Sequence, residues 1–404
     1  MDRAALIAEI EKTVKSAETV RNSVAARYKD IEPASFEAVY VHELTSGLSA
    51  LLGKQPELKT NPMLASGAGS WTSLLMLLPR ALWLRATSAS PAAAVDWLES
   101  LLSTAEANAI FVMPLWGVDL AGEVQLSDTV RLVPWELLPD SPQRDAFTNE
   151  MPSVGSRPYS WVPPKAALVE DFTIKPLLKK DGEAVATPDT TSQTRLNDIR
   201  LSLSLCGPRT LVPGRQWAQY ISADLAELQL SPQLIPMMEI EPRVLHAFGS
   251  FDASKAQALV RRVPALEDPL RAKVHLSLDR FDRGLRRSDA GDAALEFAIA
   301  LESLLGDSST DLTYKVALRS ALLAGGKSNE KISVRDTVQT LYGLRSTVVH
   351  TGRSPDNVKT KRAGRWTPAQ VMENGARVAA SVISAVIDRG NLPDWFEFEI
   401  GSSQ

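Results

Sequence analysis

Apolar residues recur at helical spacing in the first hundred residues of the chain. The positions that show this spacing are Leu6, Ile7, Ile10, Leu48, Leu51 and Leu52. A further apolar run covers residues 70–86 and predicts a buried helix. Pro91 stands at a favourable first position for another helix over residues 92–102. We therefore predict a helical N-terminal region over residues 1–105.

From Ala109 the pattern changes to one that is typical of strands. Short stretches of β-branched, aromatic and alternating residues are separated by Asp, Ser and Gly turn signals. The predicted strands are residues 110–113, 123–126, 130–133, 167–174, 197–205 and 237–245. Residues 140–164, rich in proline and glycine, and the polar residues 179–194 predict loops. Residues 106–255 are therefore predicted to form a β-rich domain.

After Phe251 the helical pattern returns and continues. Residues 270–285 carry an apolar stripe, and residues 293–305 are apolar on nearly every face and stop at Gly306, which predicts a central buried helix. The other predicted helices are residues 312–324, 333–349 and 368–390, the last preceded by the cap Thr367. The chain is therefore expected to be an α+β multidomain protein with a C-terminal α-helical bundle over residues 256–404.

The composition indicates in which cellular compartment the protein is found. The single cysteine, Cys206, excludes an intrachain disulfide and a zinc site built from several thiolates, which fits a reducing cytosol. The N-terminus lacks the pattern of a signal peptide. The most apolar stretch is too short for a membrane span and contains Pro79 and Arg80. We expect a cytoplasmic protein that needs no membrane, metal or cofactor.

The net charge of −4 hides an asymmetry. Residues 256–390 hold 21 Lys and Arg against 15 Asp and Glu, whereas the rest of the chain holds 23 against 33. A basic module joined to an acidic one is compatible with a nucleic-acid partner for the basic part, and equally with an ordinary solvated surface.

Arg345 interrupts an apolar stripe on the predicted helix over residues 333–349. The stripe consists of Val334, Val338, Leu341 and Val348. A guanidinium on such a face needs a partner or an anion. Glu302, which interrupts the apolar helix over residues 293–305, is one candidate partner, so an Arg345–Glu302 ion pair and a bound phosphate are both open.

His350 follows Arg345 by five residues, about 140° around an ideal helix. Arg345 and His350 therefore lie on different faces, and Ser346 is the neighbour of His350 at i, i+4. The arginine can hold an anion, and an imidazole can move a proton near pH 7. The two groups can meet on one phosphate only if the helix frays near Thr351 and Gly352, or if a second copy supplies the other half.

Three segments of the C-terminal region resemble the signature of HEPN domains, and more narrowly the ApeA-like HEPN group. The segments are residues 294–302, 314–323 and 341–352, the last with Arg345-Ser-Thr-Val-Val-His350. The resemblance implies a metal-independent endoribonuclease that acts as a homodimer, often as a toxin or an effector of abortive anti-phage defence. It implies that Arg345 and His350 are the catalytic pair. The residues that it places in supporting roles are Ser346, Glu302, Arg319 and Tyr342.

The chemistry implied by this resemblance is transesterification. The ribose 2′-OH would attack the adjacent phosphorus and leave a 2′,3′-cyclic phosphate and a 5′-OH. Arg345 would stabilise charge on the phosphoryl oxygens, and His350 would transfer the proton.

Cations cluster just after the motif, opposed only by Asp356. They are Arg353, Lys359, Lys361, Arg362 and Arg365, and Trp366 follows them. The cluster predicts a loop that tracks phosphates beside an aromatic ring on which a base can stack. A solvated loop with Trp366 in the core is the alternative.

Two functional hypotheses follow from these patterns. The first is a HEPN-type ribonuclease that cuts RNA, either single strands or loops of tRNA or mRNA, with a phage-derived or small-molecule trigger recognised by the N-terminal region. The second is a catalytically silent helical module for RNA binding or dimerisation, with Arg345 paired to Glu302. No constellation supports an enzyme of another kind in residues 106–255.

Overall fold

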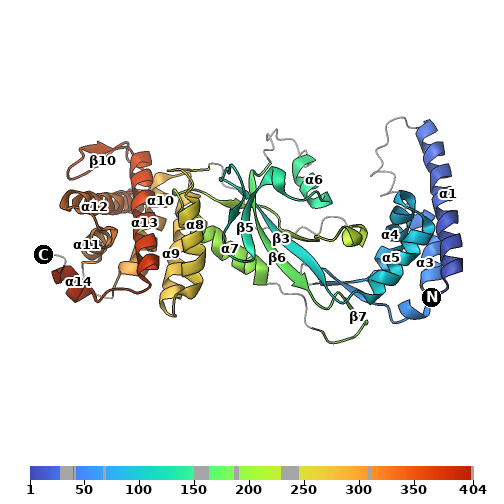
Figure 1. The fold of residues 1–404 in the computed structure, drawn as a ribbon. Coiled ribbons are helices and arrows are strands. Elements are labelled where there is room, and N and C mark those ends of the chain that lie inside the picture. The colour runs from blue at the N-terminus through green and yellow to red at the C-terminus, as the bar shows by residue number, and fades with distance from the viewer. Residues whose placement is uncertain are drawn as a thin grey trace.

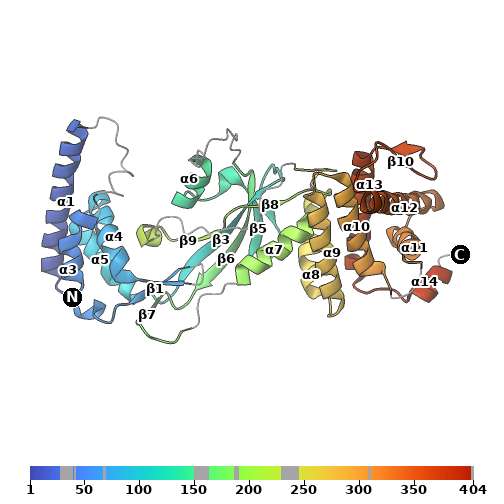
Figure 2. The ribbon, with the colours of Figure 1, turned by 180° about the vertical axis from the view of Figure 1, so that it is seen from behind.

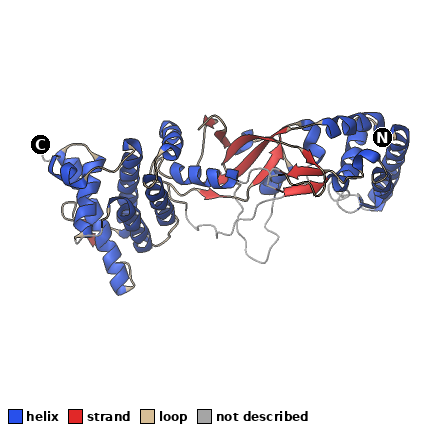
Figure 3. Cartoon of the chain, turned by 90° about the horizontal axis from the view of Figure 1, so that it is seen from below, coloured by secondary structure: helices blue, strands red, loops and turns tan. Residues whose placement is uncertain are grey.

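The computed structural model describes residues 1–27, 40, 42–66, 70–149, 163–185, 191–228, 245–307 and 311–401. The chain is an α+β protein with helices at its N-terminal end, a β-sheet in the middle and a helical bundle at its C-terminal end (Figure 1). These parts follow one another along an elongated molecule, so the two termini lie at opposite ends (Figure 2). Seen from below, most of the strands lie between the two groups of helices (Figure 3).

The N-terminal helices pack around an apolar core of their own. The elements are α1 (Arg3–Arg27), α3 (Ser46–Leu52), η1 (Pro56–Leu58), α4 (Leu74–Ser88) and α5 (Pro91–Ser103). Leu6 and Ile10 of α1 are fully buried in this core with Leu78 and Leu98. Pro91 begins α5 as expected, and the Ser90 hydroxyl caps this helix.

The predicted helix over residues 70–86 is wrong at its start. Strand β2 (Ser70–Ser73) pairs with β1 (Met63–Ser66), which also pairs with β7 (Leu178–Lys179). The helix begins only at Leu74, because the first residues of the apolar run complete a small sheet. The N-terminal region is therefore helical with one three-stranded sheet attached.

An antiparallel sheet forms the middle of the molecule. Its strands are β4 (Val124–Gln125), β5 (Val130–Pro134), β6 (Ala166–Ile174) and β3 (Ala107–Trp116) in that order, with β8 (Val212–Pro213) and β9 (Trp217–Tyr220) both paired to β3. Helix α7 (Thr191–Leu203) covers the face that carries Met113 and Leu168. Trp135 and Trp217 lie on the other face, where they meet edge to face.

The C-terminal bundle is arranged around one central helix. Its elements are α8 (Ala253–Ala265), α9 (Leu270–Leu285), α10 (Ala290–Leu305), α11 (Leu312–Ala324), α12 (Ser328–Thr351), α13 (Pro368–Arg389) and α14 (Trp395–Gly401). Helix α10 packs against α9, α11, α12 and α13. Phe297 and Leu301 on α10 are fully buried, as the apolar sequence of this helix predicts.

The sheet and the bundle share one continuous apolar core. A buried ion pair crosses the junction, with Arg200 Nη1 of α7 donating to Asp282 Oδ1 of α9 at 2.8 Å. Nearby, the Thr210 hydroxyl donates to the Leu285 carbonyl at 2.6 Å. The two parts are therefore joined by a fixed interface.

Most predicted elements are confirmed, and five predictions differ from the structure or lie outside its described residues. Residues 197–205 belong largely to helix α7 and not to a strand. The predicted loop over residues 140–164 contains helix α6 (Pro142–Asn149), and the loop over residues 179–194 ends where α7 begins at Thr191. Helix α12 begins at Ser328, because the Glu330 carboxylate accepts the Lys327 backbone N–H at 2.7 Å. The strand over residues 237–245 lies, except for Leu245, outside the described residues.

Candidate functional site

Helix α12 carries Arg345 at the rim of the bundle core. Val338, Leu341 and Leu344 on this helix are buried against α10, α11 and α13. The Arg345 side chain is 30% exposed, so its guanidinium lies where the buried face of α12 meets solvent. The expected gap in the apolar stripe is thus a boundary position and not a deeply buried one.

Arg345, Glu302 and Tyr342 form one hydrogen-bonded group. Arg345 Nη1 donates to Glu302 Oε1 at 2.6 Å, and the Tyr342 hydroxyl donates to the same oxygen at 2.9 Å. The guanidinium carbon of Arg345 also lies 5.5 Å from the centre of the Tyr342 ring. Burial, with help from the Glu302 charge, raises the pKa of Tyr342 above its ordinary value, so the phenol keeps its proton. The ion pair considered from the sequence is therefore present.

The contact with Glu302 orients the Arg345 side chain and uses only part of the hydrogen-bonding capacity of its guanidinium. A guanidinium carries five N–H donors, and the contact with Glu302 uses one nitrogen. Because the side chains of the pair are 30% and 20% exposed, water screens it, and it contributes on the order of 1 kcal/mol to stability. The remaining donors on the exposed side can bind an anion.

His350 lies at the exposed end of the same helix. Helix α12 stays regular through Thr351 and ends at Gly352, which has a φ of 67° and donates its N–H to the Val348 carbonyl. The helix therefore does not fray at Thr351, and the His350 and Arg345 side chains stay on different faces of one chain. Ser346, one turn before His350, is exposed as well.

Arg319 is held by a different set of groups. It is buried and donates to Glu399 at 2.8 Å, to the Leu305 carbonyl at 2.7 Å and to Asp307 at 2.9 Å. Its guanidinium also lies 4.8 Å from the centre of the Trp395 ring. Arg319 thus ties α14 to the end of α10, the helix that carries Glu302, and these contacts involve neither Arg345 nor His350.

The predicted basic cluster forms a hairpin that follows α12. Strands β10 (Val358–Lys359) and β11 (Arg365–Trp366) pair in antiparallel fashion. All of the cluster's cations are exposed: Arg353, Lys359, Lys361, Arg362 and Arg365. Trp366 is half-buried against the bundle core, so its ring is less available to a base than the sequence hypothesis assumes.

Asp336 anchors this hairpin, and sequence reasoning missed it. Its carboxylate accepts the backbone N–H groups of Lys361 and Arg362 at 2.8 and 3.2 Å. The carboxylate is buried, and it precedes Arg345 by nine residues, about 14 Å along the helix axis. The hairpin therefore returns along α12 and places its cations beside the helix that carries Arg345 and His350. The signal for this anchor in the sequence was an aspartate next to the apolar, buried face of a helix.

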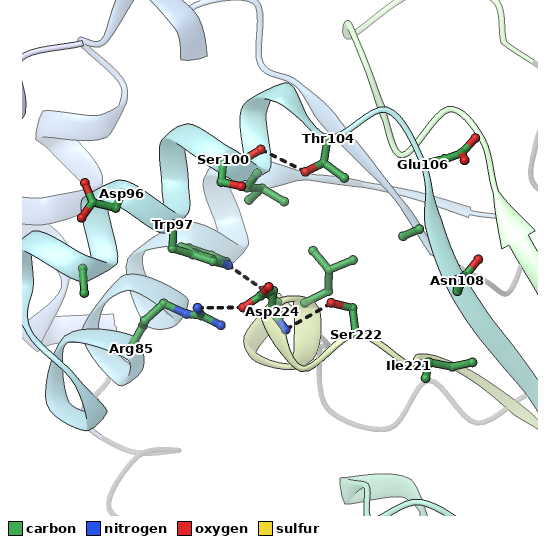
Figure 4. A pocket seen from close by; sticks show the side chains of 14 residues that line it. Arg85, Asp96, Trp97, Ser100, Thr104, Glu106, Asn108, Ile221, Ser222 and Asp224 are labelled. Atoms are coloured by element: carbon green, nitrogen blue, oxygen red, sulfur yellow. Dashed lines mark hydrogen bonds and ion pairs between the residues drawn. The ribbon is translucent and has the colours of Figure 1, made fainter.

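A polar cavity at the other end of the molecule lacks the features of a reactive site. It has a volume of about 620 Å³ and lies between α4, α5, β3 and η3 (Ala223–Leu228) (Figure 4). Arg85 bridges Asp224 at 3.2 Å and Glu227 at 3.0 Å, and it stacks over Trp97. These contacts join the N-terminal helices to the sheet, and the acidic Asp96 and Glu106 on the cavity wall have cationic partners of their own.

No family model, no curated protein and no solved structure matches the chain. Among the helices of the described ranges, none is both long and apolar enough to cross a membrane. Within the same ranges, no three His, Cys, Asp or Glu side chains gather as a metal-binding group. The resemblance to HEPN domains therefore remains a prediction.

Proposed function

We propose that the C-terminal bundle is a metal-independent endoribonuclease that acts as a homodimer in the cytoplasm, as an effector of anti-phage defence. One observation carries this proposal. A partly exposed arginine, oriented by Glu302 and Tyr342, shares a helix with an exposed histidine, and a hairpin of exposed cations runs beside that helix. This arrangement suits an RNA backbone, because phosphates bind cations and a bound phosphodiester needs a proton carrier for cleavage.

The chemistry follows from the groups that the site offers. The 2′-OH of the ribose attacks the adjacent phosphorus, the P–O5′ bond breaks, and the products are a 2′,3′-cyclic phosphate and a 5′-OH. Arg345 stabilises the charge that develops on the phosphoryl oxygens, and His350 takes the 2′-OH proton or gives one to the leaving oxygen. DNA lacks the 2′-OH and is not cut by this route.

The regular end of α12 favours a site made by two chains. Since one helix holds Arg345 and His350 on different faces, we place Arg345 of one copy and His350 of the second copy on the same phosphate. Val349, next to His350, is 61% exposed, and contact with a second copy would cover it.

A catalytically silent module is the second candidate, and the 2.6 Å contact between Arg345 and Glu302 favours it. In that case the pair would only fix α12 on α10, and the basic hairpin would bind RNA without cleavage.

The test compares three purified proteins, the wild type, Arg345→Ala and His350→Ala, on total RNA in the presence of EDTA. The proposal expects cleavage by the wild type alone, with 2′,3′-cyclic phosphate ends. Ser333→Ala, which changes an exposed serine of the same helix about 18 Å along its axis from Arg345, controls for the surface change. Growth arrest on expression that disappears with Arg345→Ala is the matching test in cells. RNA binding by all variants without cleavage by any would favour the silent module.

A further inference from the structure

The basic hairpin over residues 353–366 carries two cations that lie opposite each other. Lys359 faces Arg365 in the antiparallel register of β10 and β11, so both side chains leave the ribbon on the same face. The neighbouring pair, Val358 and Trp366, packs against the bundle core, whereas both cations are exposed. Like charges directly opposite each other destabilise a ribbon, and an anion between them removes this cost. The outer face of the hairpin therefore suits a phosphate group.

The tip of the hairpin is fixed by hydrogen bonds to its backbone. The buried Asp336 carboxylate accepts the backbone N–H groups of Lys361 and Arg362. The hydroxyl of Thr360, which is buried as well, accepts the Ala363 N–H at 2.8 Å. These bonds leave the cationic side chains in solvent. A ribbon that is already positioned loses little conformational freedom when an anion binds to it.

Asp336 also shows on which side of α12 the hairpin lies. Because α12 is a regular helix, each residue is turned by about 100° from the one before it. His350 comes 14 residues after Asp336 and lies about 40° from it around the helix. Arg345 comes nine residues after Asp336 and lies about 180° from it. The hairpin therefore lies on the side of α12 that carries His350, whereas Arg345 is on the opposite side.

Between the hairpin anchor and His350, the surface of α12 is open at Gly343. This glycine is exposed and lies midway between Asp336 and His350, within about 20° of both around the helix. A Cβ atom added to it would meet no side chain of the described residues within 4 Å. Glycine is a poor helix former, but it allows another molecule to approach the backbone closely. An RNA strand can therefore pass over this position.

We propose that the RNA strand cut at the two-chain site runs along this side of α12 to the hairpin of the copy that supplies His350. This path rests on the proposed function, and it leaves the hairpin of the copy that supplies Arg345 without a role at that site. The anchor and His350 are about 21 Å apart along the axis of α12, which a stacked strand rising about 3.4 Å per nucleotide covers in about six nucleotides. Because these phosphate contacts are the same before and during the reaction, they lower KM and leave kcat unchanged.

The first test measures RNA binding without cleavage, on a His350→Ala background. The probe is a fluorescein-labelled single strand of about 12 nucleotides, long enough to span the path, and fluorescence anisotropy gives its affinity. Lys359→Gln with Arg365→Gln should weaken binding about tenfold and lower the salt dependence, the slope of log K against log salt, by about 1. Arg261→Gln with Lys273→Gln removes the same charge from exposed positions of α8 and α9 and should not change binding. Equal affinities of the two double variants overturn the path.

A variant on the same background blocks the path without removing charge. Gly343→Leu places a side chain between the hairpin and His350, so it should weaken RNA binding about tenfold. Its melting temperature should stay the same or rise, because leucine favours a helix more than glycine does. Ser381→Leu, exposed on α13 and about 20 Å along that helix from its start beside the hairpin, is the control and should bind RNA normally.

Two results with Gly343→Leu would contradict the path. One is an unchanged affinity for RNA. The other is loss of the dimer, measured by light scattering, which would assign this side of α12 to contact with a second copy.

A mixed dimer tests which copy supplies the hairpin. A dimer with Arg345→Ala in the first copy and His350→Ala in the second keeps one intact site, whose His350 comes from the first copy. Lys359→Gln with Arg365→Gln in the first copy should raise KM for RNA about tenfold and leave kcat unchanged. The same changes in the second copy should leave KM as it was. Equal effects of the two placements, the reverse order, or an inactive mixed dimer beside an active wild type would refute the assignment.

Two outcomes distinguish the RNA path from the proposed ribonuclease. If the wild type cleaves RNA while the hairpin variants bind it normally, the ribonuclease stands and the path is wrong. If the wild type cuts no RNA, the ribonuclease and the assignment of copies both fail, and the binding of the Gly343→Leu and hairpin variants alone shows whether RNA lies along α12.

Discussion

Two arginine–carboxylate pairs in this molecule have similar chemistry and different surroundings. The Arg200–Asp282 pair at the junction is enclosed, with its side chains only 5% and 6% exposed. The Arg345–Glu302 pair at the rim of the bundle has side chains that are 30% and 20% exposed. The enclosed pair fixes two parts of the fold, because Asp282 also pairs with Arg286 at 3.0 Å and none of these three side chains is more than 14% exposed to water. The open pair orients a cation that solvent, or a phosphate, can still reach.

An ion pair is therefore not by itself an argument against function. The contacts with Glu302 and Tyr342 restrict the rotation of the Arg345 side chain, while N–H donors remain on its exposed side. A positioned cation of this kind stabilises a transition state better than a mobile one, since less order has to be created during the reaction.

The largest expected effect comes from breaking the enclosed pair. Asp282→Ala leaves the buried Arg200 without its carboxylate, and we expect a loss of about 3–5 kcal/mol in the free energy of unfolding, measured by urea denaturation. Asp279→Ala is the matched control on the same helix, because its pair with Arg283 is partly exposed and should contribute less than about 1 kcal/mol. If the two variants lose the same unfolding free energy, enclosed and exposed ion pairs do not differ in their contribution to stability.

The next effect concerns how closely α12 approaches α10. A Cβ atom at Gly291 would lie 2.4 Å from Val348 Cγ2, so Gly291→Ala should cost about 1–3 kcal/mol in unfolding free energy. Adding Val348→Ala should restore part of that loss by making room for the new methyl group. Strictly additive losses in the double variant would show that the two helices are not in contact at this position.

A smaller effect should appear at high pH. The pKa of Tyr342 is raised in the fold, so the folded chain keeps a proton that the unfolded chain loses above about pH 10. The stability contribution of this proton is complete below pH 10 and falls as the pH rises further, by about 1.4 kcal/mol at about pH 11.

Tyr342→Phe supplies the comparison for this pH effect. Denaturation curves of the wild type should show a steeper loss of stability above pH 10 than those of the variant. If stability falls equally steeply with pH in the two proteins, the pKa of Tyr342 is not raised by burial.

The smallest effect on stability is expected at the open pair. Glu302→Gln should lower the unfolding free energy by about 1 kcal/mol or less, because the pair is screened. The same change removes a negative charge beside Arg345, so RNA should bind more tightly while cleavage becomes slower. Fluorescence anisotropy on a His350→Ala background separates binding from cleavage, and weaker binding would contradict the assigned role of Glu302.

Helix ends in the bundle were predictable because their signals are local. Gly306 and Gly352 end their helices and Thr367 caps the last long one, as expected from glycine, proline and threonine at those positions. The Arg345–Glu302 pair could also be considered in advance, since each residue interrupts an apolar stripe. These features depend on a few neighbouring residues.

Features that depend on distant parts of the chain were missed. Leu201, Leu203 and Leu205 alternate with serines and imitate a strand, whereas Leu196, Ile199 and Leu203 together form the buried side of α7. The anchoring of the hairpin by Asp336 requires knowing that residues 361 and 362 return to α12.

The most direct measurement of the central claim uses a heterodimer of two inactive variants. Arg345→Ala and His350→Ala are co-expressed with different tags, and the mixed dimer is purified and tested on RNA in EDTA beside a doubly tagged wild type. If each site takes Arg345 from one copy and His350 from the other, one of the two sites is intact and the mixed dimer recovers about half of the wild-type activity. A mixed dimer as inactive as either parent, while the tagged wild type cleaves, would contradict a site built by two chains.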